Sequence, residues 1–139
     1  MNKKYILEQI QLRSMNTLVE NLGIEITDLE DCVVYGKMPV DKRTLQPFGL
    51  LHGGASVALA ETLGSVGGGI QINHETHNVV GLEINTSHLR SVSEGWVYGK
   101  ANAIRLGKKI QVWEISIKNQ QEKIISISRL TLAVIKKNT

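Results

Sequence analysis

Two periods of apolar residues divide the chain into helical and strand-like segments. Residues 3–20 place apolar side chains at roughly helical spacing, and residues 53–67 are apolar on nearly every side, which predicts two helices, the second one buried. Four later runs are rich in β-forming residues, with short polar turns between them: 77–89, 96–106, 110–118 and 123–135. Because connections this short join antiparallel neighbours, we expect a buried central helix and a long antiparallel sheet able to wrap it.

Shorter signals predict where the elements end. Residues 24–29 and 33–40 have the pattern of two further strands, the second ended by Pro39. The run Gly67-Gly68-Gly69 is expected to end the central helix, because glycine is common just past a helix. In the last run the apolar face changes parity near Ser128, which predicts a bulge or a curved sheet there.

Composition predicts one globular domain without a polyanionic partner. The chain has 139 residues, enough for a single core, and we assign residues 1–139 to one domain. A formal net charge of +3, with no dense run of lysine or arginine, argues against nucleic acid as a partner. Cys32 is the only cysteine, so no disulfide framework is expected. No window approaches the roughly 18 apolar residues of a membrane span, and the first residues lack a signal-peptide core, so we expect a cytoplasmic protein with no membrane partner.

One carboxylate, Glu61, lies in the middle of the apolar helix. Burying an ionised carboxylate is costly, so its position calls for a reason. Residues four apart share a helix face, which lets Ser65 hydrogen-bond Glu61 or a water beside it. Gly53 and Gly54 lie at the start of the helix, where unpaired N–H groups and the helix dipole would favour a carbonyl oxygen that gains negative charge. This combination predicts a catalytic site.

Simpler interpretations exist for each residue alone. A helix glutamate is most often solvated, and His52 is most often a polar residue at a helix start. Glu61 also lies two turns beyond Gly53, roughly 10–12 Å by helical rise, so the two would not easily share one carbonyl. The grouping of Gln46, Gly53 and Ser65 around Glu61 nevertheless favours function over a purely structural role.

The pattern Gln46…His52-Gly53-Gly54…Glu61…Ser65 resembles the signature of the hotdog-fold acyl-CoA thioesterases, in the PaaI-like branch. It is most similar to bacterial 1,4-dihydroxy-2-naphthoyl-CoA hydrolases, which would place the chain in menaquinone biosynthesis, and to hydroxybenzoyl-CoA hydrolases. The resemblance covers nearly the whole chain, is weakest over the first 20 residues or so, and includes these stretches: 38–44, 46–52, 80–85, 88–90, 106–107 and 111–113. It implies an α+β hotdog fold, with a long central helix wrapped by a curved antiparallel sheet.

The resemblance also implies a role for each residue of the signature. Glu61 would be the nucleophile or the general base, and the Gly53 N–H would polarise the thioester carbonyl. Gln46 would orient the thioester, His52 would support the loop and the leaving side, and Ser65 would position Glu61 or a water. Members of the family build each site between two subunits, so a homodimer or a dimer of dimers is expected.

Two basic clusters are candidates for binding the phosphates of coenzyme A. By resemblance both line the nucleotide site, with Val80 against the pantetheine arm: Ser87, His88, Leu89 and Arg90 at a strand end, and Arg105, Gly107, Lys108 and Lys109 at a hairpin turn. Lysines in a hairpin turn are also ordinary solubility features. His74 and His77 lack a third ligand nearby, so no metal site is predicted, and no cofactor is implied because coenzyme A is part of the substrate.

Two other functions remain open. Hotdog-fold hydratases and dehydratases also use a histidine and an acid, but typically in a His-Phe-Pro pattern, which differs from His52-Gly53-Gly54. A non-catalytic module that binds acyl-CoA would not need Gln46, Glu61 and Ser65 together. The acyl group is suggested to be aromatic by the resemblance alone, because an aromatic content of 4% predicts a pocket of aliphatic residues and glycines.

Overall fold

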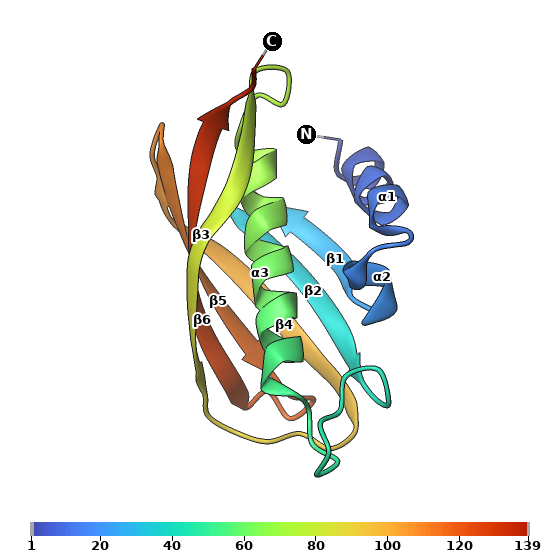
Figure 1. Cartoon of the computed structure of the whole chain (residues 1–139). Helices are drawn as coiled ribbons and strands as arrows, with labels where there is room; N and C mark the ends of the chain where they lie inside the picture. Colours follow the sequence, from blue (N-terminus) through green and yellow to red (C-terminus); the bar gives the residue numbers. More distant parts are fainter. Residues whose placement is uncertain (1, 139) are drawn as a thin grey trace.

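Six antiparallel strands form one sheet that curves around the helix α3, in a computed structural model that describes residues 2–138 (Figure 1). In spatial order the strands are β1 (Glu25–Glu30), β2 (Val33–Val40), β4 (Gly95–Leu106), β5 (Ile110–Lys118), β6 (Ile124–Lys136) and β3 (His77–His88). The helices are α1 (Lys3–Ser14), α2 (Leu18–Asn21) and α3 (Gly53–Ile70). The predicted α+β arrangement of a central helix and a wrapping antiparallel sheet is confirmed.

The predicted end of the central helix is wrong, because α3 continues through its three glycines to Ile70. A Cβ atom on Gly67 would lie 2.6 Å from the ring of Trp113, and one on Gly68 would collide with Leu132. Gly67 and Gly68 therefore let the helix approach the sheet closely, and they do so at buried positions where tertiary packing outweighs their poor helix propensity.

A buried polar pair supports this close approach. The indole N–H of Trp113 donates to Oε1 of Gln111 at 2.9 Å, and the amide of Gln111 donates to the carbonyl of Gly68 at 3.3 Å. Both side chains are almost completely buried, so their polar atoms need these partners. The segment Gln111-Val-Trp113 is therefore explained by packing.

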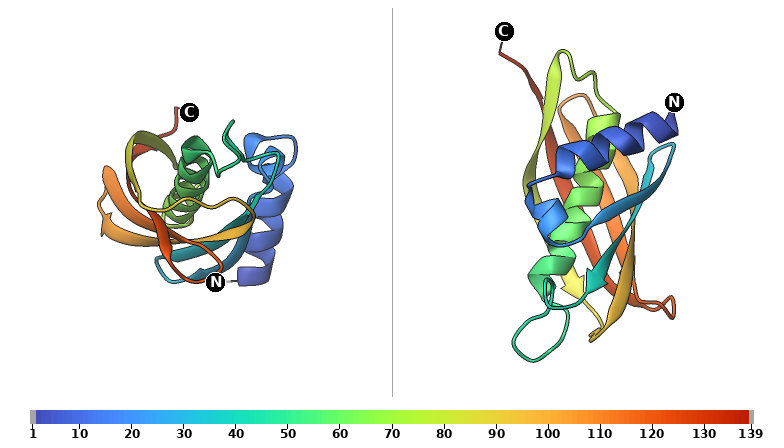
Figure 2. Two further views of the ribbon diagram at one scale, coloured as in Figure 1. Left: turned by 90° about the horizontal axis from the view of Figure 1, so that it is seen from below. Right: turned by 90° about the vertical axis from the view of Figure 1, so that its right-hand side faces the viewer.

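The predicted first helix is two helices, α1 and α2, separated near Asn16, whose φ is 61°. Leu7 and Ile10 of α1 pack against the core, and α1 lies beside β1 on the side of the sheet that holds α3 (Figure 2). Lys3 and Asp28 form an ion pair at 2.8 Å between α1 and β1. Their hydrogen bond raises the pKa of Lys3 and lowers that of Asp28.

The predicted strand at residues 33–40 is confirmed as β2, in which Pro39 is paired with Trp96 and Val40 is the last residue. One other prediction is corrected by the sheet register. The parity change in β6 occurs at Ile125, not at Ser128, because Ile117 pairs with Ser126 and the next residue of β5 pairs with Ile124. The extra residue makes a bulge, as predicted, but three residues earlier in the chain.

The strand β3 is one edge of the sheet. It is twelve residues long and pairs with β6 only, with an irregularity between Gly81 and Glu83. A long edge strand exposes backbone N–H and C=O groups that another strand can pair with. None of the helices among residues 2–138 is long and apolar enough to cross a membrane.

Candidate active site

The loop between β2 and α3 extends beyond the end of the sheet and leads into the start of α3 (Figure 2). Asp41 and Arg43 brace its first turn with an ion pair at 2.7 Å, and the hydrogen bonds from Arg43 lower the pKa of Asp41 to about 2. The backbone N–H of His52 donates to the carbonyl of Thr44 at 2.8 Å. The turn at residues 41–44 therefore sets the position of the residue that caps α3.

His52 caps α3 and satisfies all but one of the first N–H groups of the helix. Its Nδ1 accepts from the N–H of Gly54 at 2.8 Å, so the ring proton lies on Nε2 when the histidine is neutral. Its carbonyl accepts from the N–H groups of Ala55 at 3.0 Å and Ser56 at 3.2 Å. Within residues 2–138, the N–H of Gly53 has no acceptor. One donor at the positive end of the helix dipole is therefore free for a ligand oxygen.

Glu61 lies eight residues after Gly53 along α3, and its side chain is half-buried. The fully apolar surroundings expected from the sequence are thus only partly present. Ser65 is also half-buried, one helical turn further on, but no hydrogen bond joins it to Glu61 among the described residues. Gly81 of β3 lies against Glu61, since a Cβ atom on Gly81 would lie 2.9 Å from Oε1 of Glu61.

His88 lies at the same end of the molecule as the free N–H of Gly53. Its ring covers Gly53, since a Cβ atom there would lie 3.1 Å from both Cε1 and Nε2 of His88. The resemblance assigns His88 to the nucleotide site, whereas the structure places its ring next to the candidate oxyanion donor. Gln46 is half-buried in the preceding loop, and its Oε1 accepts from the backbone N–H of Phe48.

Within one chain, Glu61 and Gly53 face different parts of β3. Glu61 contacts Gly81, and Gly53 contacts His88 at the last position of the strand. At about 3.3 Å per strand residue, the two contact points are roughly 20 Å apart along β3. Gly53 and Glu61 also lie eight residues apart on one continuous helix, about 12 Å by helical rise, so a single chain does not bring the two groups to one carbonyl.

The two basic clusters lie at opposite ends of the sheet. Ser87 and His88 are the last residues of β3, beside the start of α3, and Leu89 and Arg90 follow them. The turn between β4 and β5 carries Gly107, Lys108 and Lys109 at the other end of the sheet (Figure 1). Arg90 donates through Nη1 to the carbonyl of Ile124 at 3.1 Å. One chain therefore does not assemble a single nucleotide site from both clusters.

The structure also shows where three other residues of the predicted nucleotide site lie. Leu89 is exposed, and its backbone N–H donates to the carbonyl of Ile125 at 2.8 Å. Arg105 is exposed, and its guanidinium lies over Gly107. Val80 neighbours Gly81 on β3 and therefore points to the face of the sheet away from α3.

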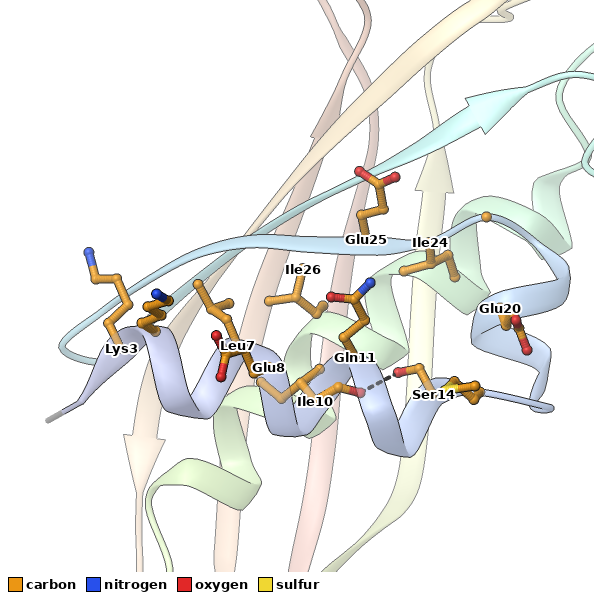
Figure 3. Close-up of a pocket in the computed structure, with 13 residues that line it drawn as sticks. Lys3, Leu7, Glu8, Ile10, Gln11, Ser14, Glu20, Ile24, Glu25 and Ile26 are labelled. Atoms are coloured by element: carbon orange, nitrogen blue, oxygen red, sulfur yellow. Dashed lines mark hydrogen bonds between the residues drawn. The ribbon is translucent and has the colours of Figure 1, made fainter.

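A groove between α1 and β1 is lined by none of these residues. It has a volume of about 750 Å³, with Leu7, Ile10 and Ile26 among its apolar lining residues (Figure 3). Lys3, Glu20 and Glu25 contribute charges of both signs to it. Among residues 2–138, no three potential metal ligands come together, near His74 and His77 or elsewhere.

The chain is similar to known proteins over most of its length. The thioesterase superfamily matches residues 48–126, which include the start of α3, Glu61 and the end of β3. The chain belongs to the thioesterase superfamily. This thioesterase is 52% identical to the proofreading thioesterase EntH of Cronobacter turicensis over 128 residues, covering 92% of this chain and 93% of that protein.

Solved structures show the same fold. A thioesterase from Haemophilus influenzae has a TM-score of 0.90 and 48% identity, and the match covers 94% of this chain and 90% of that one. A mutant thioesterase from Pseudomonas aeruginosa has a TM-score of 0.93 and 43% identity, and the match covers 94% of both chains. The predicted hotdog fold and thioester hydrolase class are confirmed, and membership favours hydrolysis over the hydratase and the non-catalytic module.

Two residues of this region do not stand out in the sequence signature. Gly81 interrupts an otherwise strand-like run, which is a recognised signal of close approach by another group. Phe48 is 89% exposed at the tip of the loop that carries Gln46, although aromatic side chains of that size are usually covered. The first signal was readable from sequence, whereas the exposure of Phe48 required the structure.

Proposed function

We propose that this thioesterase hydrolyses an acyl-CoA thioester, with the Gly53 N–H as oxyanion donor and Glu61 as nucleophile or general base. The observation that carries the proposal is the hydrogen bonding at the start of α3. His52 occupies the neighbouring N–H groups and leaves that of Gly53 free, among residues 2–138. A donor held by a capped helix is preorganised, and one such donor is typically worth about 3–4 kcal/mol in the transition state.

The reaction needs only water and one carboxylate. Glu61 either takes a proton from water, whose oxygen attacks the thioester carbon, or attacks that carbon itself and forms an anhydride that water then hydrolyses. In both routes the carbonyl oxygen gains negative charge opposite Gly53, the carbon–sulfur bond breaks, and the sulfur leaves as a thiolate that is protonated to the free thiol. The products are one carboxylic acid and one molecule of coenzyme A.

The separation of Glu61 from Gly53 supports a site shared by two subunits. β3 is an edge strand of the sheet, and a two-fold axis between Ile84 and Asn85 would pair it with β3 of a second copy in antiparallel fashion. Gly81 of one subunit would then lie beside the His88 end of the other. Glu61 of one chain would therefore face the Gly53 N–H of its partner, in a homodimer or in a dimer of dimers.

The same pairing would unite the two basic clusters. The turn that carries Lys108 and Lys109 lies at the His77 end of β3, and Arg90 lies just beyond the His88 end. Antiparallel pairing would bring the turn of one subunit toward Arg90 of the other. Cations from two chains would then surround the phosphates of one coenzyme A, whereas one chain alone presents them far apart.

Mixing two inactive variants tests the shared site. Glu61→Gln keeps Gly53 intact, and Gly53→Pro keeps Glu61 intact. If each site takes these residues from different chains, a mixed dimer contains one intact site and one doubly altered site. Refolding the two variants together at equal concentrations should recover about one quarter of the activity of identically refolded wild type, since half of random dimers are mixed.

The control for that experiment replaces the Gly53→Pro partner with a chain that carries both substitutions. No mixed dimer then has an intact site, so activity should stay at the level of the single variants. If the informative mixture also stays at that level, although refolded wild type is active, both groups act within one chain and the shared site is wrong.

The acyl group is proposed to be aromatic, such as hydroxybenzoyl or dihydroxynaphthoyl. Phe48 supports this choice, because its exposed ring lies on the loop of Gln46 and offers a stacking surface to a flat acyl group. The small side chains along α3, such as Ala58, leave room beside Glu61.

A panel of CoA thioesters would test the choice of substrate. Hydroxybenzoyl-, dihydroxynaphthoyl- and phenylacetyl-CoA would be compared with medium- and long-chain acyl-CoA by release of free thiol. We expect kcat/KM to be at least about tenfold higher for the aromatic group, a difference of about 1.4 kcal/mol in transition-state binding. Equal or higher values for aliphatic chains would show that the pocket selects size and not flat rings.

A further inference from the structure

Gly81 of β3 lies against the proposed catalytic carboxylate. A Cβ atom built on Gly81 would lie 2.9 Å from Oε1 and 4.0 Å from Cδ of Glu61. Real Cβ atoms essentially never approach another atom so closely. The carboxylate therefore occupies space that any other amino acid at position 81 would fill.

Gly81 is exposed on the edge strand, and the buried glycines of the fold have a different environment. Gly64 and Gly67 of α3 and Gly99 of β4 would each place a Cβ atom against an apolar core side chain. Among residues 2–138, Gly81 is the only glycine whose nearest neighbour is a side-chain carboxylate. Core packing explains the first group, but it does not explain Gly81.

The backbone at Gly81 does not require glycine. The glycines with positive φ are Gly23, Gly49 and Gly95, so Gly81 has a conformation that other residues adopt readily. The irregularity in β3 comes immediately after Gly81 in the chain. Gly81 pairs with Leu132 and Glu83 pairs with Thr131, so Leu82 is an extra residue. Bulges of this kind redirect a strand locally and are frequent beside active sites.

We propose that Gly81 is a positioning residue for the thioesterase reaction, because its missing side chain leaves the space in which the Glu61 carboxylate is held. This inference rests on the proposed role of Glu61. It assigns β3 a function beyond pairing, since the strand determines how far the carboxylate extends from α3. A methyl group at position 81 displaces the carboxylate, and misplacement of a catalytic group by about 1 Å can cost roughly 100-fold in rate.

The substitution Gly81→Ala separates this role from a structural one. The atom that the new methyl group meets is the end of a flexible side chain, so the carboxylate moves and the backbone stays. Alanine also loses less chain entropy than glycine in a strand, so the melting temperature should be unchanged or raised. We expect kcat for an aryl-CoA to fall at least about tenfold, with KM changed by less than about threefold.

Gly69→Ala is the matched control. Its Cβ atom would meet only Cε1 of His74, at an ordinary contact distance of 3.6 Å, and it would not touch Glu61. Its kcat and KM should stay close to those of wild type.

A second test measures the effect of Gly81→Ala on kcat in the Glu61→Asp variant. If Gly81 had only a structural role, that effect would be the same as in wild type. Aspartate is one methylene shorter and does not reach the methyl group at position 81. Adding Gly81→Ala to Glu61→Asp should therefore change kcat by less than about twofold, although it lowers kcat at least about tenfold in wild type. Coupling of this size identifies the carboxylate as the group through which position 81 acts.

Several outcomes would overturn the inference. These are a wild-type kcat in Gly81→Ala, an equal fold-loss in the wild-type and Glu61→Asp backgrounds, or a clearly lowered melting temperature. Glu61→Gln, measured in the same assay, distinguishes an error in the role of Gly81 from an error in the proposed function. If Glu61→Gln is inactive while Gly81→Ala is fully active, only the role of Gly81 is wrong; if Glu61→Gln is active, the proposed function is wrong as well.

Discussion

Glu61→Gln is expected to lower kcat for an aryl-CoA thioester at least about 100-fold. The amide has the size and shape of the carboxylate, but it neither accepts a proton from water nor attacks a thioester. The side chain is half-buried and forms no hydrogen bond among the described residues, so the substitution leaves no partner unsatisfied. The melting temperature should therefore match wild type, and release of free thiol under saturating substrate measures the loss.

Glu75→Gln is a suitable control for this variant. Glu75 is exposed in the loop between α3 and β3, so removing the same charge there should leave kcat unchanged. A Glu61→Gln enzyme that keeps more than about a tenth of the wild-type kcat would be inconsistent with either chemical role for Glu61.

Gly53→Pro is expected to lower kcat by about 100- to 1,000-fold, because it removes the N–H at the start of α3 that is proposed to hold the oxyanion. The fold should tolerate the change. Proline is favoured at the first position of a helix, and the N–H that it lacks has no acceptor among residues 2–138 of the wild-type protein. The preceding residue, His52, has φ −64° and ψ 128°, which is the extended conformation that a residue before proline adopts.

Gly53→Ala separates the loss of the donor from crowding. Both variants place a Cβ atom against the ring of His88, but only proline removes the N–H. The ratio of kcat between the alanine and proline variants therefore measures the contribution of the donor. If the two variants are equally active, the Gly53 N–H does not stabilise the transition state, and the effect of proline is steric.

The order of elements could be predicted from local patterns, whereas some of their ends could not. The strands β3 to β6 and the apolar helix follow from periodicity that a short window contains. The error at Gly67 to Gly69 has a specific cause. These glycines match a helix stop by propensity, but Trp113 and Leu132 approach the helix there and need the space of the missing side chains.

In the candidate site, too, some features could be predicted from local sequence and others could not. The sequence pattern identified Glu61, Gly53 and His52, because their spacing along a helix and its cap is local. It did not identify the contact of His88 with Gly53, which joins the end of a strand to the start of a helix. Residues so distant in sequence meet only through the register of the sheet and the way α3 crosses it.

Local patterns were enough to predict the class of fold, the helix that carries the Glu61 carboxylate and the glycines at the start of that helix, because propensity and capping act within a few residues. Three features required the folded structure: the N–H of Gly53 lies beside His88 without an acceptor among residues 2–138, Gly81 lies against Glu61, and Gly53 and Glu61 contact different parts of β3. These features depend on packing between elements and on an unpaired edge strand. They are set by contacts across the whole fold, which no local pattern contains.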